Sequence, residues 1–142
     1  MLRTSGPADS LHVTDTVVKA DSVINWEKMT HDQRKAYMKD VIMPKIKPIF
    51  VQFDAKKFRD MKCATCHGEG AHNGQFKMPN PELPKLPNTR ALFQKLVRDK
   101  PQWMEFMDKT VKPSMANLLS MPLFDPKTGK GFSCGNCHTT RE

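Results

Sequence analysis

Apolar residues fall at helical spacing in the first third of the chain. Thr30 and Gln33 form the pattern of a capping box, which marks the start of a helix over residues 31–43. The apolar positions on one face of this helix are Tyr37, Val41 and Ile42. We expect Pro44 and Pro48 to kink or restart the helix, because proline removes a backbone donor and crowds the preceding turn.

Two further stretches carry a helical pattern. One opens at Asn88 or Thr89 and runs to Val97, and the next begins at Pro101, a residue that suits the first helical position. The apolar residues of the latter are Trp103, Phe106 and Met107. The pattern as a whole predicts a mainly α-helical fold with little or no sheet.

Glycine- and proline-rich segments separate these helices. We expect a loop at residues 68–74, an extended proline-stiffened strap at residues 78–87 and a turn at residues 125–131. Residues 1–25 are polar and weakly patterned, so we interpret them as an extended N-terminal arm. This leaves residues 26–142 as a single domain.

The helical and proline positions recur within the sequence. At an offset of 69 residues, Tyr37-Met38 matches Phe106-Met107, Ile42-x-Pro44 matches Val111-x-Pro113, and Ile49-Phe50 matches Leu118-Leu119. After a two-residue insertion, Phe53-Asp54 matches Phe124-Asp125. The repetition predicts two similar halves, about residues 26–75 and 95–142, each containing a helix, a turn and a cysteine motif.

That cysteine motif is Cys-x-x-Cys-His, at residues 63–67 and 134–138, and it uses all four cysteines of the chain. In c-type haem attachment, two thiols of this motif add to the haem vinyl groups and the adjacent imidazole binds the iron. The motif therefore predicts two covalently bound haems (heme c). The candidate thioether anchors are Cys63, Cys66, Cys134 and Cys137, and the candidate proximal iron ligands are His67 and His138.

Other sites also use Cys-x-x-Cys pairs. Two pairs can form a zinc ribbon, and a single pair can be a redox dithiol or a disulfide. Zinc needs neither of the two histidines, and the pairs are much farther apart in sequence than the cysteines of a zinc knuckle. Haem attachment is therefore the favoured interpretation.

These residues resemble the attachment sites of c-type cytochromes, specifically of a small dihaem cytochrome. The order of helix, turn and motif in each half loosely resembles the repeating units of the tetrahaem cytochrome subunit of photosynthetic reaction centres. The resemblance implies a small dihaem cytochrome c built from two similar helix–turn–motif halves with long proline-rich loops.

A closed haem iron needs a second axial ligand, usually methionine or histidine. Four residues of the sequence follow the second motif, so we expect the distal ligands to come from upstream. Met115 is the preferred distal ligand of the second haem. The aligned residue in the first half is Ile46, which cannot bind iron, and Met43 on the same helical face is the candidate there. Met78 in the strap and His72 are rivals for the first haem.

The chain carries a formal charge of +8 at pH 7. A basic surface would attract acidic redox partner proteins, or hold the chain near an anionic surface such as that of a membrane-bound electron-transfer complex. The lysines are not massed in one run, so nucleic acid is disfavoured as a partner. No apolar run reaches the length of a transmembrane segment.

The resemblance also implies a location and a function. Because haem c is attached outside the bacterial cytoplasm, we expect a periplasmic or other extracytoplasmic protein from which an export leader or lipid anchor has been removed. The leading hypothesis is electron transport between respiratory or photosynthetic redox partners, without catalytic residues. The alternative is a peroxidase-like haem enzyme or a gas-binding sensor with one open iron, and the mismatch at Ile46 points to the first haem.

Only 38% of the residues are hydrophobic, which is low for a chain of 142 residues with a core of its own. Two haems would supply the missing apolar filling. We therefore predict that a chain with all four cysteines changed to alanine, and hence without haem, unfolds without a cooperative transition in calorimetry. A sharp melt at the temperature of the haem-loaded protein would contradict this prediction.

Overall fold

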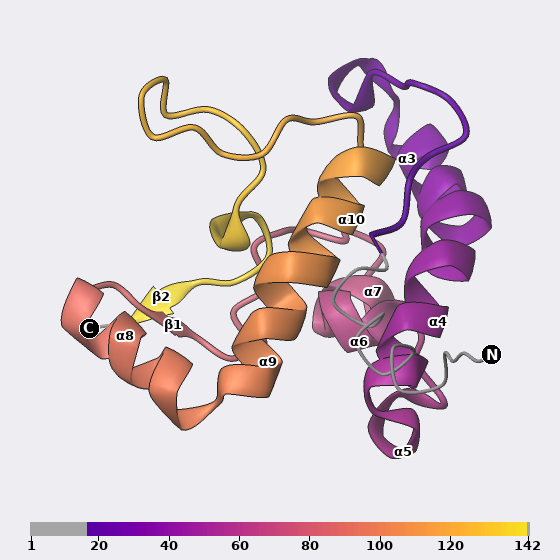
Figure 1. Ribbon diagram of the computed structural model, residues 1–142. Coiled ribbons are helices and arrows are strands. Elements are labelled where there is room, and N and C mark those ends of the chain that lie inside the picture. The colour runs from indigo at the N-terminus through magenta and orange to yellow at the C-terminus, as the bar shows by residue number, and fades with distance from the viewer. Residues whose placement is uncertain (1–16, 142) are drawn as a thin grey trace, which may run out of the picture. The chain divides into compact units, whose positions relative to one another are not determined.

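The computed structural model of the protein describes residues 17–141, and element labels follow Figure 1. The described chain is mainly helical, with one pair of very short strands, as the sequence predicts. It divides into two compact units, each built from two segments of the sequence. Among the described residues, unit 1 contains 17–59 and 105–122, and unit 2 contains 60–104 and 123–141.

These units differ from the two predicted half-repeats. Residues 26–59 of the first half and 105–122 of the second belong to unit 1, whereas both cysteine motifs belong to unit 2. Of the predicted N-terminal arm, residues 1–16 lie outside the described part of the chain. The arm residues that follow contact unit 1: Val18 N–H donates to Ser114 Oγ at 2.9 Å, and Ile24 N–H donates to Ser120 Oγ at 2.9 Å.

The first helical stretch begins at the predicted capping box. Gln33 N–H donates to Thr30 Oγ1 at 3.1 Å, and Thr30 N–H donates to Gln33 Oε1 at 2.8 Å. This box satisfies backbone donors that have no partner inside the helix. The elements that follow are α3 (His31–Tyr37), the π-helical turn η2 (Met38–Ile42), α4 (Met43–Phe53) and α5 (Ala55–Phe58).

The expected interruption at Pro44 takes the form of this π turn. Met43 N–H bonds to Met38 O, five residues back. Pro44 has no N–H to donate, and its ring would crowd the carbonyl four residues earlier in a regular α-helix. The wider turn relieves that conflict. Pro48, by contrast, lies inside α4 without ending it.

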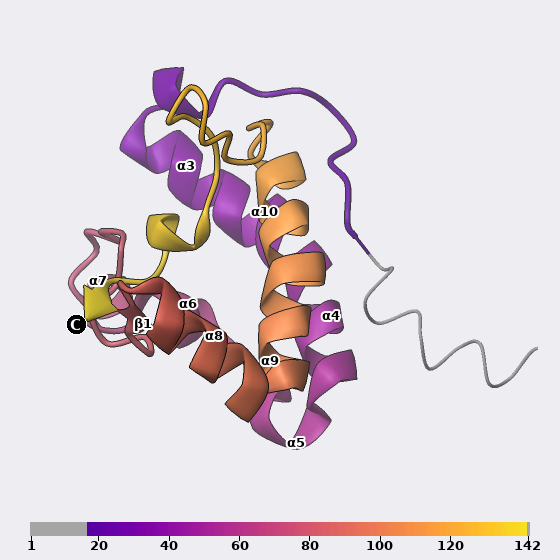
Figure 2. The same ribbon diagram turned by 60° about the vertical axis from the view of Figure 1, so that its left-hand side comes forward.

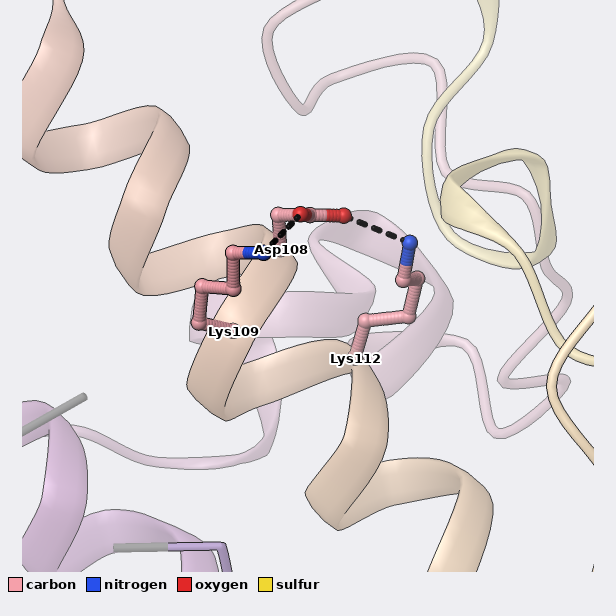
Figure 3. A network of polar contacts seen from close by, with 3 residues as sticks. All are labelled: Asp108, Lys109 and Lys112. Atoms are coloured by element: carbon pink, nitrogen blue, oxygen red, sulfur yellow. Dashed lines mark hydrogen bonds and ion pairs between the residues drawn. The ribbon is translucent and has the colours of Figure 1, made fainter. Parts of the chain in front are cut away.

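The second helical stretch has the same feature. It consists of α9 (Pro101–Phe106), which begins at the predicted proline, the π turn η3 (Met107–Val111) and α10 (Lys112–Leu118). Lys112 N–H bonds to Met107 O, and Pro113 follows immediately. On the exposed side of this turn Asp108 lies between two lysines, 2.6 Å from Lys112 Nζ and 3.9 Å from Lys109 Nζ (Figure 3).

Aromatic contacts join the two segments of unit 1. The ring of Phe106, which is buried, stacks on Phe53 with centroids 4.1 Å apart and meets Phe50 edge-on at 5.1 Å. At the other end, Tyr37 Oη donates to Leu118 O at 2.6 Å. The two stretches therefore run antiparallel, and α10 lies beside α3 and α4 (Figure 1, Figure 2).

Unit 2 contains the remaining elements after α5. They are α6 (Cys63–His67), α7 (Glu69–His72), β1 (Leu86–Pro87), α8 (Arg90–Asp99), the 3-10 turn η4 (Cys134–Asn136) and β2 (Thr140–Arg141). Helix α8 begins after Thr89 as predicted, with Leu92 N–H donating to Thr89 Oγ1. The prediction of a loop throughout residues 68–74 is wrong, because α7 forms within it. Strands β1 and β2 pair in parallel, side by side in Figure 1.

Few side chains are buried in unit 2. They are Met61, Asn80, Pro87 and Phe132. The predicted turn at residues 125–131 is confirmed, with Asp125 and Lys130 bridged across it. Beside that turn Leu123 and Phe124 remain 47% and 46% exposed. Unit 2 is therefore held together less by apolar packing than unit 1.

We predict that Phe106→Ala lowers the free energy of unfolding by about 3–5 kcal/mol, because it removes a buried ring that two other rings contact. The matched control is Phe124→Ala, which removes an exposed ring and should change stability by about 0.5 kcal/mol or less. Urea denaturation of the two variants and the parent checks this. Equal losses would show that Phe106 is not a core residue.

Candidate functional site

Both Cys-x-x-Cys-His motifs lie in unit 2. The first forms α6, and the second forms η4 together with the two residues that follow it. All four thiols are free rather than joined in disulfides. Cys63 is exposed, and Cys66, Cys134 and Cys137 are half-buried.

The two motifs share one local hydrogen-bond pattern. In the first, Lys62 N–H donates to Thr65 Oγ1 at 3.0 Å, and Thr65 N–H donates back to Lys62 O at 2.9 Å. In the second, Ser133 N–H donates to Asn136 Oδ1 at 2.9 Å, and Asn136 N–H donates back to Ser133 O at 3.0 Å. This reciprocal pair resembles a capping box in which a backbone carbonyl replaces the N-cap side chain as acceptor, and it curls both cysteines of a motif into one helical turn. The signal in the sequence is the side-chain acceptor before the second cysteine, which our sequence interpretation missed.

Asn80, in the strap, bonds to both motifs. Its Nδ2 donates to Cys66 O at 2.9 Å, and its backbone N–H donates to Cys137 O at 2.9 Å. Its Oδ1 accepts from Glu82 N–H at 2.9 Å, and the side chain is only 3% exposed. Nothing in the sequence signals this role, because an asparagine among prolines is an ordinary turn residue.

His138 has a hydrogen bond that fixes its tautomer. Its Nδ1 lies 2.8 Å from Pro84 O. A carbonyl oxygen only accepts hydrogen bonds, so Nδ1 carries the proton and Nε2 of the neutral ring keeps its lone pair. Histidines that bind metals are commonly held in this way by a partner on the other ring nitrogen.

His67 has a different environment. Its ring meets Phe76 edge-on, with centroids 5.3 Å apart and planes at 87°. Among residues 17–141, its Nδ1 is buried without a hydrogen-bond partner. Burial lowers the pKa of His67, which favours the neutral imidazole. The neutral ring is the form that binds metals.

The second cysteine of each motif is strongly shifted toward the neutral thiol. Burial, and then the neighbouring Cys63, raises the pKa of Cys66 to about 11. Burial, and then Cys66 and Cys134, raises the pKa of Cys137 to about 12. Reactive redox dithiols require the opposite shift, toward the thiolate. The influence of Cys66 on Cys137 also places the two motifs near each other within unit 2.

The residues that follow the first motif lie against the strap. Gly68 ends α6 with a φ of +55°, a conformation that favours glycine. A Cβ at this position would lie 2.5 Å from the carboxylate of Glu82. That carboxylate accepts from Glu69 N–H at 2.8 Å, at the start of α7. The strap therefore contacts the first motif at both Asn80 and Glu82.

The candidate distal ligands fall in both units. Met78 is half-buried in unit 2, two residues before Asn80, and is thus in the same unit as the motifs. Met43 and Met115 are half-buried in unit 1, on α4 and α10. Ile46 is buried, and His72 is exposed on α7.

The donor set of each motif suits covalent haem. Each offers two free sulfurs within one turn, held by the reciprocal hydrogen bonds described above, and a histidine next in sequence. Among residues 17–141, no three or more His, Cys, Asp or Glu side chains gather as a metal-ion site. No helix in that part of the chain is long and apolar enough to cross a bilayer.

Comparison with protein-family profiles, with curated proteins and with solved structures finds no significant match to the chain.

We predict that Gly68→Ala destabilises the protein by more than Gly74→Ala does. Both glycines have positive φ, so both substitutions cost about 1–3 kcal/mol in backbone strain. A Cβ at Gly74 meets nothing within 4 Å, whereas at Gly68 it meets the Glu82 carboxylate. Thermal midpoints of the two variants measure the difference. The double variant Gly68→Ala/Glu82→Ala should recover part of the loss, and no recovery would rule out the clash.

Proposed function

We propose that this chain is a dihaem c-type cytochrome that transfers electrons. Cys63 and Cys66 would anchor one haem, and Cys134 and Cys137 the other. The observation that carries the proposal is the shared turn of the two motifs, with the same reciprocal hydrogen bonds at positions 71 residues apart in the sequence. When bound, the haems would supply reversible one-electron chemistry.

The histidines would set the properties of the iron. His67 and His138 are the proposed proximal ligands. The bond from His138 Nδ1 to Pro84 O orients that ring and raises its basicity as a ligand. His67 is instead held by the edge of Phe76 and by burial. The protein thus contributes ligand orientation and burial, and needs neither a general acid nor a nucleophile.

A relay between two haems is the mechanism that best fits the location of both motifs in unit 2. Asn80 bonds to Cys66 O and to Cys137 O, so one residue spans the distance between the motifs. The residues of unit 2 would thus hold both haems, which would supply one-electron chemistry at two neighbouring sites.

We also propose that the chain arose from two similar helix–turn–motif halves. The π turns at Met38–Ile42 and Met107–Val111 support this, because they occur at the same offset of 69 residues that aligns the sequences. Each is followed by proline at the second position of the next helix. For the distal ligands, we keep Met115 for the second haem and Met43 for the first, with Met78 as the rival.

The partners would be acidic redox proteins, alone or in a membrane-bound electron-transfer complex, met in the periplasm. The support is electrostatic: the formal charge of the chain is +8. At Asp108 two lysines are paired with one carboxylate, so this ion-pair network keeps a net positive charge. The alternative function, a peroxidase-like enzyme or gas sensor, would require one open iron. The first haem is the candidate, because the buried Ile46 occupies the position aligned with Met115 and cannot bind iron.

We predict two haems per chain by pyridine haemochrome assay and by intact mass after expression with a haem-attachment system. The variants Cys63→Ala/Cys66→Ala and Cys134→Ala/Cys137→Ala should each retain one haem, because the motifs are independent attachment sites. Stoichiometric zinc without haem would reject the proposal.

Carbon monoxide separates the two functions. If both irons have two axial ligands, the reduced spectrum should not respond to the gas. A response in the variant that keeps only the first haem would favour catalysis or gas binding over electron transfer.

A further inference from the structure

We infer that Asn80 is a positioning residue that fixes the two haem motifs relative to each other and thereby couples the two haems. The inference rests on the proposed function, because it assumes that both motifs carry haem. It concerns a residue of the strap that lies outside both motifs.

Every hydrogen-bonding group of Asn80 is engaged. The side-chain amide donates to Cys66 O at 2.9 Å, and the backbone N–H donates to Cys137 O at 2.9 Å. The side-chain oxygen accepts from Glu82 N–H at 2.9 Å, and the backbone carbonyl accepts from Leu83 N–H at 3.2 Å. Because the side chain is 3% exposed, water cannot readily replace these partners.

The two motif contacts of Asn80 fall on equivalent residues. Cys66 and Cys137 are the second cysteines of their motifs, so each contact is one residue from a histidine and on the residue that would carry a thioether. A shift of Asn80 would therefore move both attachment points. Asparagine offers both an amide donor and a carbonyl acceptor at the end of a short side chain, whereas an ionised aspartate only accepts and the hydroxyls of serine and threonine are closer to the backbone.

The rest of the strap holds Asn80 in place. Toward the first motif, Glu82 accepts from Glu69 N–H. Toward the second, Pro84 O meets His138 Nδ1, and Leu86 N–H donates to Thr139 O at 2.9 Å. Asn80 is thus the point at which the contacts to the two motifs meet, and its position is not free to adapt.

Coupling between the haems can be measured as a shift in their midpoint potentials. Two redox centres that influence each other titrate with apparent potentials that belong to the pair, as coupled acids do. The interaction is the difference between the midpoint potential of a haem in the dihaem protein and in the variant that keeps that haem alone. The double cysteine-to-alanine variants described above supply both references.

The test compares Asn80→Ala with Asn88→Ala in the haem-loaded protein by spectroelectrochemical titration. Asn88 is an exposed asparagine immediately after the strap whose backbone N–H bonds to Arg141 O, a contact that alanine keeps. Asn80→Ala keeps the backbone bond to Cys137 O but loses the side-chain bonds to Cys66 O and Glu82 N–H, so we expect it to shift the midpoint potential of the first haem and to reduce the interaction between the two haems. Asn88→Ala should leave both potentials at the parental values.

Asn80→Ser guards against a variant that fails to fold. Serine is neutral and can still accept from Glu82 N–H, but it is too short to reach Cys66 O. We expect its thermal midpoint to lie closer to that of the parent, while its haem interaction falls as in Asn80→Ala. A parental potential of the first haem together with a parental interaction in Asn80→Ser would overturn the inference. A parent protein without haem would instead reject the proposed function.

Discussion

The backbone hydrogen bonds between the strap and the segment that follows the second motif are the interaction on which unit 2 depends. Asn80, Leu86 and Asn88 donate their N–H groups to Cys137, Thr139 and Arg141. Apolar packing cannot replace this ladder, because so few side chains in unit 2 are buried. Backbone groups left without partners would each cost about 1–3 kcal/mol, so the ladder fixes the path of the strap and with it the environment of both motifs.

Unit 1 obeys a different constraint, the incompatibility of proline with a regular helix. Pro44 and Pro113 would each interrupt the α-helical bonds of their stretch. The π turns accommodate the prolines without breaking either helical stretch. The rings of Phe50 and Phe53 can therefore contact Phe106. Unit 1 thus has an aromatic core, whereas unit 2 is held mainly by polar contacts. The proposed haems would add apolar surface to unit 2.

The sequence predicted those features whose causes are local. The helix starts at Thr30, Thr89 and Pro101 follow from capping chemistry within three residues, and the structure confirms them. Helix α7 was missed because its glycines suggest a loop, whereas a carboxylate 13 residues away binds its first turn. The bonds of Asn80 were missed for the same reason, since they join segments far apart in the chain. The cysteine motifs themselves are visible in the sequence, but their proximity in one unit is a property of the fold.

The division of the chain into interleaved segments has a consequence for biosynthesis. Each unit needs residues from beyond position 104, so neither can close before that part of the chain has been made. Cys63 in the first motif is exposed. The folded environment of this motif is complete only when the strap has paired with residues 139–141. Such long-range pairing forms slowly. Attachment at Cys63 and Cys66 would therefore meet an open, accessible polypeptide, and closure of the fold would come after it.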